Sequence, residues 1–476
     1  MENDQEQKPF VHLFQTSLGC YLYDVNTGKI ISLSQKVYEY LDGKVSDEEE
    51  IEVKNSIEVL KNNGFLKSKQ VQKTMHPKTR IVEYILKYHL QMLTLQVTQN
   101  CNLRCEYCVY SGGYLQREHQ ERNMSFEVAK KALDFLLEHS QDSSKLNVGF
   151  YGGEPLMNID LIKKVVAYMK QEAEGKTVEY NITTNGTLLN EEIVKFLVEN
   201  NFHIMISLDG PRSIHDEYRK FFHSEKGSFD ILMKNVKRIK QVYAEYFSKN
   251  VCFNTVLNPN RGFKCIGDYI QGESLFKDSY FSSSLLSENY KEEDNVISEE
   301  FIKEYSYEIF KVFLYKLGYL EEKHISHIFK DYFDSLMRNY EMKEFFKREE
   351  LPNAWHHGGP CVPGGLRAFV SVDGELFPCE RVSETSKVAR IGDLDNGFDM
   401  KQIYSLLNLE EITEEKCHNC WAYEHCSVCV ACADDTKKLS RERIFKRCPI
   451  VQQTFENELK DYSVLKTLGY DFDKGL

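Results

Sequence analysis

The sequence predicts an α/β protein built on a partial parallel barrel, with a further domain at each end of the chain. From Leu93 onward, short β-rich runs alternate with helical patterns, as in βαβ units that form a parallel sheet. Six such units indicate a partial TIM-like (β/α)6 barrel, in which ligands bind at the carboxyl ends of the strands. The expected strands are Leu93–Val97, Leu146–Tyr151, Val178–Thr183, His203–Leu208, Val251–Leu257 and Tyr280–Leu286. The clearest helical patterns between them are Ser125–His139, Asn190–Glu199 and Ser228–Tyr246.

Length and charge narrow the class of protein. A chain of 476 residues is long enough for about three domains. Its net charge of −13 argues against non-specific binding of nucleic acid, which needs a basic face. No run approaches the roughly 18 apolar residues of a membrane-spanning helix. The first residues, Met1–Glu6, are polar and acidic and lack the features of a secretory signal. We therefore expect a cytoplasmic protein with no membrane partner.

Residues 1–75 are expected to form a small winged-helix-like domain. Strands are predicted at Phe10–Phe14, Cys20–Val25 and Lys29–Leu33, because a turn with Asn and Gly separates the last two apolar runs. A helix at Ser34–Leu41 and a second helix follow, and Ser46 with Glu49 makes a capping box for the second. A short strand is predicted at Phe65–Leu66.

The charge of this domain helps to decide whether it binds DNA or a peptide. It holds nine lysines, no arginine and twelve acidic residues, which disfavours DNA. Capture of an extended peptide on a strand edge is the favoured interpretation, and a docking domain without a ligand is the alternative. A Lys-rich linker is expected at residues 76–92, so the domain is predicted to be separable from the chemistry downstream of residue 90.

Clustered cysteines point to metal or iron–sulfur ligation. Fourteen cysteines in a chain without an export signal do not suggest disulfides. The isolated Cys20, Cys252 and Cys265 are predicted to be ordinary buried thiols. By contrast, Cys101, Cys105 and Cys108 form a CxxxCxxC loop directly after the first barrel strand. Three thiolates leave one iron of a four-iron cluster without a protein ligand, whereas a structural zinc normally takes four.

This loop, its place after the first strand and Tyr107 resemble the radical SAM superfamily. The family binds S-adenosylmethionine (SAM) on the open iron of a [4Fe–4S] cluster and makes a 5′-deoxyadenosyl radical. The resemblance extends over four further strand ends. It implies that the Gly152-Gly153-Glu154-Pro155 motif contacts the methionine amino group, Ser207 the ribose, Arg219 the methionine carboxylate and Val256 the adenine. Tyr107 and Asn185, the latter in Thr183–Thr187, complete the expected cofactor-binding set.

The C-terminal region carries eight further cysteines. A helical bridge is predicted at 298–355, a cysteine-rich domain at 356–460 and a tail at 461–476. The order C…GxxxxC…CxxCxxxxxC…C resembles the SPASM extension, which holds two auxiliary [4Fe–4S] clusters; a zinc ribbon is the alternative. The resemblance implies a nearer cluster on Cys361, Cys379 and Cys429, one ligand short, and an outer cluster on Cys417, Cys420, Cys426 and Cys448.

The sequence departs from the SPASM pattern in several places, and one is that only Cys361 stands upstream of Gly374, where some relatives carry two cysteines. Two residues rather than three separate Cys426 from Cys429, so either Cys429 or Cys432 could be the ligand, and Cys429 is favoured. Glu380 stands where formylglycine-forming relatives carry an aspartate, and it is the candidate catalytic base.

The resemblance as a whole implies a radical SAM/SPASM peptide maturase. Its N-terminal domain would bind the leader of a ribosomally made precursor peptide, and the expected product is a cysteine thioether cross-link. Three [4Fe–4S] clusters, SAM and a flavodoxin- or ferredoxin-type reductant are implied. The alternatives are an anaerobic sulfatase maturase that forms formylglycine, a maturase that forms carbon–carbon or carbon–oxygen links, and a non-catalytic iron–sulfur or zinc scaffold.

Overall fold

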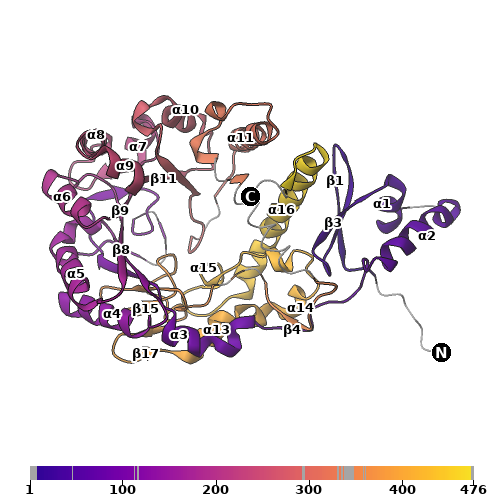
Figure 1. Cartoon of the computed structure of the whole chain (residues 1–476), viewed down its shortest axis with the longest axis horizontal. Coiled ribbons are helices and arrows are strands. Elements are labelled where there is room, and N and C mark those ends of the chain that lie inside the picture. The colour runs from indigo at the N-terminus through magenta and orange to yellow at the C-terminus, as the bar shows by residue number, and fades with distance from the viewer. Residues whose placement is uncertain are drawn as a thin grey trace.

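The six predicted barrel strands are confirmed in a computed structural model of the chain (Figure 1). They are parallel and adjacent in the order β12-β11-β9-β8-β7-β5. Their bounds are Met92–Thr98 (β5), Lys145–Gly152 (β7), Thr177–Thr184 (β8), His203–Ser207 (β9), Val251–Leu257 (β11) and Tyr280–Leu285 (β12). The structure describes residues 8–44, 47–111, 113–114, 117–291, 295–329, 332–333, 336, 348–357, 359 and 361–472.

Amphipathic helices cover the outside of this sheet. In α4 the Ser125 side chain caps the helix by accepting from the Val128 N–H, and the buried alanines and leucines face the strands. The predicted helix Ser228–Tyr246 is in fact two helices, because Tyr243 leaves the helical region at φ −130° and ψ 53°. The covering helices are α4 (Phe126–Glu138), α5 (Ile159–Glu172), α6 (Glu191–Glu199), α7 (Arg212–Tyr218), α8 (Phe229–Val242), α9 (Ala244–Asn250) and α10 (Lys264–Gly272).

The central sheet is longer and more mixed than the six-stranded prediction. Strand β14 (Arg367–Val370), from the cysteine-rich region, pairs in parallel with β5. Strands β15 (Glu375–Phe377), β16 (Gly392–Asp393) and β17 (Gly397–Phe398) then extend the sheet with antiparallel pairing. Backbone hydrogen bonds thus join the barrel directly to the segment that contains Cys379.

The N-terminal region is a three-stranded antiparallel sheet followed by two helices. Its elements are β1 (Val11–Thr16), β2 (Gly19–Asp24), β3 (Lys29–Leu33), α1 (Gln35–Leu41) and α2 (Asp47–Asn62). The predicted strand at Phe65–Leu66 is wrong. Leu66 has a φ of +63°, and its N–H donates to the buried Asp24 carboxylate at 2.8 Å instead of entering a ladder. The predicted cap Ser46 lies outside the described residues.

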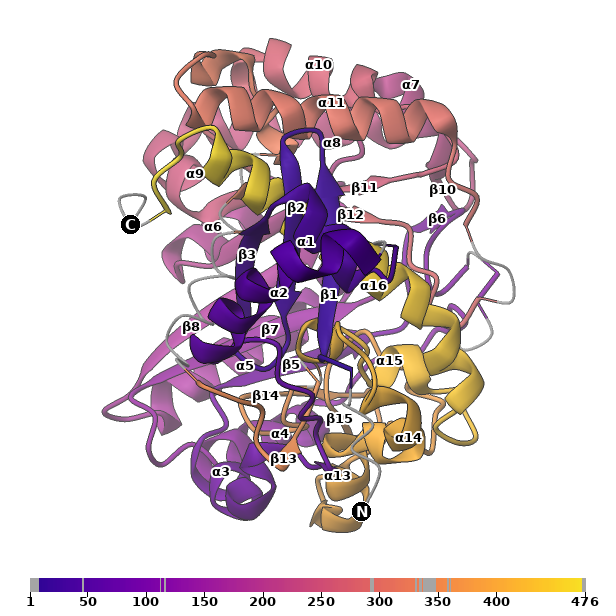
Figure 2. The same cartoon turned by 90° about the vertical axis from the view of Figure 1, so that its right-hand side faces the viewer.

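This N-terminal sheet packs against the C-terminal helix α16 (Arg441–Thr467), as Figures 1 and 2 show. His12 on β1 stacks on Trp421 with ring centroids 3.5 Å apart, and its Nε2 lies 3.1 Å from Glu456 of α16. Tyr23 makes an edge contact with Phe455. The short strands β4 (Lys73–Thr74) and β13 (Ala354–Trp355) add a parallel pairing. The N-terminal sheet therefore packs directly against the cysteine-rich region and α16.

The segments that connect these parts are also ordered in places. The predicted linker contains helix α3 (Val82–Tyr88), whose Val82 and Leu86 enter the main core. In the predicted bridge, α11 (Glu299–Lys316) is helical, whereas most of 330–347 lies outside the described residues. The remaining elements are β6 (Leu103–Cys105), β10 (Arg219–Phe221), α13 (Met400–Leu407), α14 (Glu414–Cys417) and α15 (Val430–Ala433). Among the described residues, no helix combines the length and apolar character needed to cross a membrane.

Candidate active site

The three thiols of the cysteine loop gather at the carboxyl end of β5. Strand β6 within the loop pairs with β10, which places Cys105 opposite Arg219. The Cys108 N–H donates to the Cys105 carbonyl at 3.0 Å, so the loop turns back on itself. Burial raises the pKa of all three thiols, that of Cys105 to about 12, and the proximity of the other thiols raises the pKa of Cys101 further. Three sulfurs on one loop, one buried and two half-buried, fit the donor set of a cluster with one open iron.

The paired glycines at the end of β7 allow its backbone to come close to the segment that follows β5. Gly152 has a φ of +143°, and a Cβ there would lie 2.0 Å from the Thr98 carbonyl oxygen. A Cβ on Gly153 would lie 2.2 Å from the Asn100 carbonyl oxygen. The Gly153 N–H donates to Thr98 at 3.0 Å. The observed close approach is therefore to the segment that leads into the cysteine loop, and glycine is needed for that reason.

Glu154 ties this motif to the next strand end. Its buried carboxylate accepts from the Thr184 hydroxyl at 2.7 Å, the Asn185 N–H at 2.8 Å and the Leu156 N–H at 3.1 Å. Burial raises its pKa to about 7 in spite of these donors. Asn185 in turn donates to Asn102 at 2.8 Å and lies 3.9 Å from the Cys101 sulfur. The predicted residues on this side of the site are thus brought together around the cysteine loop.

On the other side of the site, Asp209 links three predicted site residues, although Asp209 itself was not predicted to be one. Asp209, two residues after Ser207 at the end of β9, is 1% exposed. Its carboxylate accepts from Arg219 Nε at 2.7 Å, from the Tyr107 hydroxyl and from the Val256 N–H at 3.2 Å. Burial is the largest single influence and would raise its pKa, but the charge and hydrogen bonds of Arg219, together with His215 and Tyr107, lower the pKa overall. The sequence signal was the Asp209-Gly210-Pro211 string, which also fits a turn.

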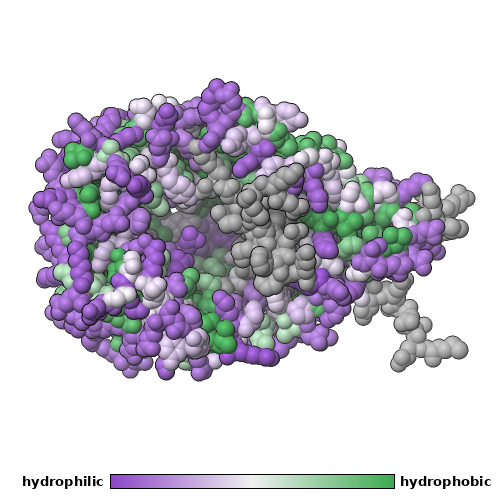
Figure 3. All heavy atoms as spheres, viewed as in Figure 1, coloured by the Kyte–Doolittle hydropathy of each residue, from purple (hydrophilic) through white to green (hydrophobic). Residues whose placement is uncertain are grey.

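These residues surround the carboxyl ends of the strands. In the space-filling view of Figure 3, the surface is hollowed where the strands of Figure 1 enclose the centre of the barrel. Polar groups that suit the parts of SAM meet there with a three-thiol loop, so the residues present fit a cluster and this cofactor. Cys101, Cys105 and Cys108 are the residues that could hold the cluster.

Comparison with known proteins identifies this part of the chain. Residues 95–270 match the model of the Radical SAM superfamily. We call this stretch, which is similar to that superfamily, the radical SAM domain. The chain is 38% identical over 176 residues to a cysteine-type anaerobic sulfatase-maturating enzyme of Clostridium novyi. This match covers 36% of this chain and 44% of that enzyme. It is 36% identical over 159 residues to a serine-type anaerobic sulfatase-maturating enzyme of Bacteroides thetaiotaomicron. This match covers 33% of this chain and 38% of that enzyme.

The chain therefore matches less than half the length of these two relatives. Among solved structures, native anSMEcpe with bound AdoMet and Cp18Cys peptide superposes with a TM-score of 0.53 at 21% identity. The superposition covers 78% of this chain and 99% of that one. At this identity the likeness is one of fold, and it extends well beyond the radical SAM domain.

Outside the radical SAM domain, the four cysteines predicted for an outer cluster line one cavity of about 200 Å³. Cys417, Cys420 and Cys426 come from one segment, and Cys448 comes from α16. The proximity of the other three thiols contributes to raising the pKa of Cys426, although burial is the larger cause. The cavity is also lined by Glu410 and His357, whose Nδ1 lies 3.3 Å from the Glu410 carboxylate. This buried pair gave no signal in the sequence.

Of the three cysteines predicted for the nearer cluster, Cys379 lies near Cys361, whereas Cys429 lies beside Cys432, the alternative ligand. Cys379 lies near enough to Cys361 for its pKa to be raised slightly by that thiol, after burial and Glu380. The Cys429 and Cys432 thiols are hydrogen-bonded to one another, which lowers the pKa of Cys432 to about 6 and raises that of Cys429. Within the described part of the chain, no three His, Cys, Asp or Glu side chains lie close enough to hold a single metal ion.

Glu380, the candidate base, follows Cys379 at the edge of the barrel. Its side chain is 26% exposed and lies 3.9 Å from Arg367. Its carbonyl accepts from the buried Arg117 at 3.0 Å. Arg117 also pairs with the buried Glu384 at 2.6 Å, and Glu384 accepts from Gln96 on β5 at 2.8 Å. This buried network, which the sequence did not reveal, fixes the Glu380 segment to the loop after Cys108.

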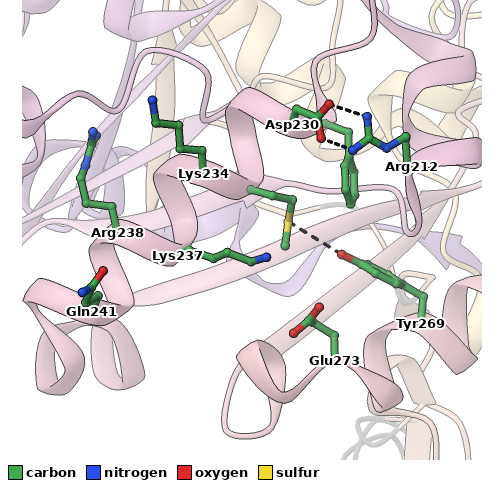
Figure 4. Close-up of a pocket in the computed structure, with 10 residues that line it drawn as sticks. Arg212, Asp230, Lys234, Lys237, Arg238, Gln241, Tyr269 and Glu273 are labelled. Carbon is green, nitrogen blue, oxygen red and sulfur yellow. Dashed lines mark hydrogen bonds and ion pairs between the residues drawn. The ribbon is translucent and has the colours of Figure 1, made fainter.

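A larger cavity, of about 590 Å³, lies outside the barrel wall between α8 and α10 (Figure 4). Lys234, Lys237 and Arg238 extend from α8, and Glu273 lies across from them. Arg212 pairs there with the exposed Asp230. None of the predicted site residues lines this cavity.

Proposed function

We propose that this chain is a radical SAM enzyme that matures a ribosomally made precursor peptide by forming cysteine thioether cross-links. The observation that carries the proposal is the docking of a small antiparallel sheet, with its β3 edge unpaired within the described residues, onto the cysteine-rich region beside a radical SAM domain. A peptide-binding edge suits a long substrate that must reach a barrel mouth.

The residues around the barrel mouth divide the work of holding SAM. Cys101, Cys105 and Cys108 hold a [4Fe–4S] cluster, which supplies the electron for SAM cleavage when a flavodoxin- or ferredoxin-type protein has reduced it. Arg219 pairs with the methionine carboxylate, Ser207 binds the ribose and Val256 lines the adenine. Tyr107, Gly152, Gly153, Glu154 and Asn185 hold the loops that surround the cofactor.

The C-terminal cysteines serve the second half of the reaction. A hydrogen atom leaves a substrate carbon for the 5′-deoxyadenosyl radical, which becomes 5′-deoxyadenosine. The cysteine S–H proton goes to a base, and the sulfur bonds to that carbon. This leaves one electron over for each link. Cys361, Cys379 and Cys429 on the barrel side and Cys417, Cys420, Cys426 and Cys448 in the outer cavity hold two auxiliary clusters that accept it. Glu380, beside Cys379, takes the proton.

The leader of the precursor binds to the edge of β3. Strand β1 packs against α16, whereas Lys29 and Ser32 of β3 are exposed. Hydrogen–deuterium exchange of the intact protein with a precursor peptide is expected to show slower exchange at Lys29–Leu33. Val11–Thr16 serves as an internal control and is expected to be unchanged. Equal protection of both strands, or of neither, would contradict leader binding at this edge.

The activity itself is tested by mass spectrometry. The reconstituted enzyme, SAM and dithionite are incubated without oxygen with precursor peptides encoded beside the gene. We expect 5′-deoxyadenosine and a product lighter by two hydrogens per link, with a cysteine that no longer reacts with iodoacetamide. Cleavage of SAM without any change in the peptides would reject the thioether assignment.

A second candidate function is formylglycine formation on a sulfatase. Two relatives named as anaerobic sulfatase-maturating enzymes favour it, although their matches cover less than half of each relative. A sulfatase-derived peptide with Cys or Ser at the modified position separates the two. A product that reacts with hydrazine probes, as an aldehyde does, would support this candidate instead.

A further inference from the structure

Asp209 accepts hydrogen bonds from three separate segments of the site. Tyr107 lies between two cysteines of the loop, Arg219 begins β10, and Val256 lies on β11. Arg219 contributes Nε at 2.7 Å and Nη2 at 3.4 Å. The Tyr107 hydroxyl shares Oδ2 with Nε, and the Val256 N–H binds Oδ1 at 3.2 Å. Each carboxylate oxygen thus has two donors, which uses its capacity for hydrogen bonds.

A carboxylate with its acceptors filled is not available to a ligand. Arg219, however, uses only one edge of its guanidinium on Asp209, and Nη1 has no partner recorded among the described residues. A planar guanidinium held along one edge presents its remaining N–H groups in a fixed direction. Asp209 therefore orients Arg219 without touching what Arg219 binds.

A second chain of hydrogen bonds connects the backbone at Asp209 to the backbone at Arg219. The Asp209 N–H donates to His215 Nδ1 at 3.4 Å, and His215 Nε2 lies 3.0 Å from the Ser228 hydroxyl. That hydroxyl donates to the Arg219 carbonyl at 2.9 Å. Burial keeps His215 neutral by lowering its pKa to about 3, which suits an imidazole that accepts at Nδ1. Asp209 and Arg219 are thus held next to one another by hydrogen bonds between their side chains and by hydrogen bonds that link their backbones.

We propose that Asp209 is a positioning residue for SAM, which sets the mutual placement of the cysteine loop, the Arg219 guanidinium and the adenine-lining strand. The proposal rests on the SAM-binding part of the proposed function, but it needs neither a peptide substrate nor thioether formation. It can therefore fail or stand independently of the peptide assignment.

The test compares two Arg–Asp pairs that differ in burial. D209N removes the charge from the buried pair, and D230N does the same for the exposed Arg212–Asp230 pair outside the barrel. Both variants are reconstituted and assayed for iron, for SAM affinity by equilibrium dialysis, and for the EPR spectrum of the reduced cluster with and without SAM. In D209N the buried Arg219 charge loses its charged partner, which costs free energy. We therefore expect D209N to raise the Kd for SAM by about tenfold or more.

The expected pattern is specific. D209N should keep the iron content of the wild type, bind SAM weakly and lack the wild-type change in the EPR spectrum at saturating SAM, whereas D230N should match the wild type throughout. If D209N does not fold, Y107F removes one donor without leaving a charge unpaired and should raise the Kd for SAM by about threefold. Wild-type affinity and spectrum in D209N, or in Y107F where D209N fails to fold, would overturn the proposal.

Discussion

The cysteine loop and the outer cysteine cavity bring thiols together by different routes. In the loop, one segment of eight residues carries all three cysteines, and the pairing of β6 with β10 shapes it. In the cavity, three cysteines come from one segment and Cys448 arrives on the long helix α16. The first arrangement is local, whereas the second depends on how distant segments pack.

The surroundings of the two regions differ in the same way. The cysteine loop is held by residues of the barrel itself, such as Glu154 and Asp209. The outer segment instead packs against the N-terminal sheet, through the stacking of His12 on Trp421, directly after Cys420. Substitutions at the loop should therefore act on one step of chemistry, whereas substitutions around the cavity should also act on stability and on the placement of the N-terminal domain.

The largest expected effect is at the loop. Cys105→Ala leaves no spare thiol nearby, so SAM cleavage should be lost completely, as measured by 5′-deoxyadenosine formation after anaerobic reconstitution. Cys252→Ala on β11 is the control, and it should cleave SAM at the wild-type rate. Retained cleavage in the Cys105 variant would show that the cluster does not depend on this loop.

The outer cavity should respond with loss of a single cluster. Three clusters correspond to about twelve irons per chain, and Cys426→Ala should lower the count to about eight. Uncoupled SAM cleavage should persist, because the loop is intact. Iron and zinc are measured by elemental analysis. Cys265→Ala is the control, because this thiol is exposed and not buried as predicted. About four irons with stoichiometric zinc in the unaltered protein would show a zinc ribbon in place of auxiliary clusters.

The Cys429–Cys432 pair offers a finer test within the same region. The order of cysteines favours Cys429 as the ligand, so Cys429→Ala should lose the Mössbauer signal of the nearer cluster while Cys432→Ala keeps it. The two variants are matched controls for one another, since their thiols are neighbours. Loss of the signal in the Cys432 variant alone would reverse the assignment.

The smallest effect concerns stability and pH. Burial raises the pKa of Glu154 from 4.5 to about 7, so between these values the folded chain holds a proton that the unfolded chain has released. The free energy of unfolding of the metal-free chain should therefore fall as the pH rises through this window, by at most about 3 kcal/mol. Glu154→Gln should flatten this slope in urea denaturation, whereas Glu245→Gln, on the exposed face of α9, should not. An unchanged slope in Glu154→Gln would contradict the raised pKa.

Much of the molecule was predictable from local sequence. The six barrel strands and the hairpin follow from periodicity, and the close spacing of Cys101, Cys105 and Cys108 places them on one loop; both signals depend on neighbouring residues alone. The helix break at Tyr243 and the absence of a strand at Phe65–Leu66 were not predicted, because they depend on contacts such as the one between Leu66 and Asp24.

Only the tertiary structure decided how segments that are distant in the sequence meet. The joining of β14 to β5, the docking of the N-terminal sheet on α16 and the convergence of Tyr107, Arg219 and Val256 on Asp209 link segments up to hundreds of residues apart. Sequence spacing fixes which residues can share a strand end, because the period of each element is local. The pairing of a buried charge with its partner depends on strand register and packing, because burial penalises every alternative that leaves the charge alone.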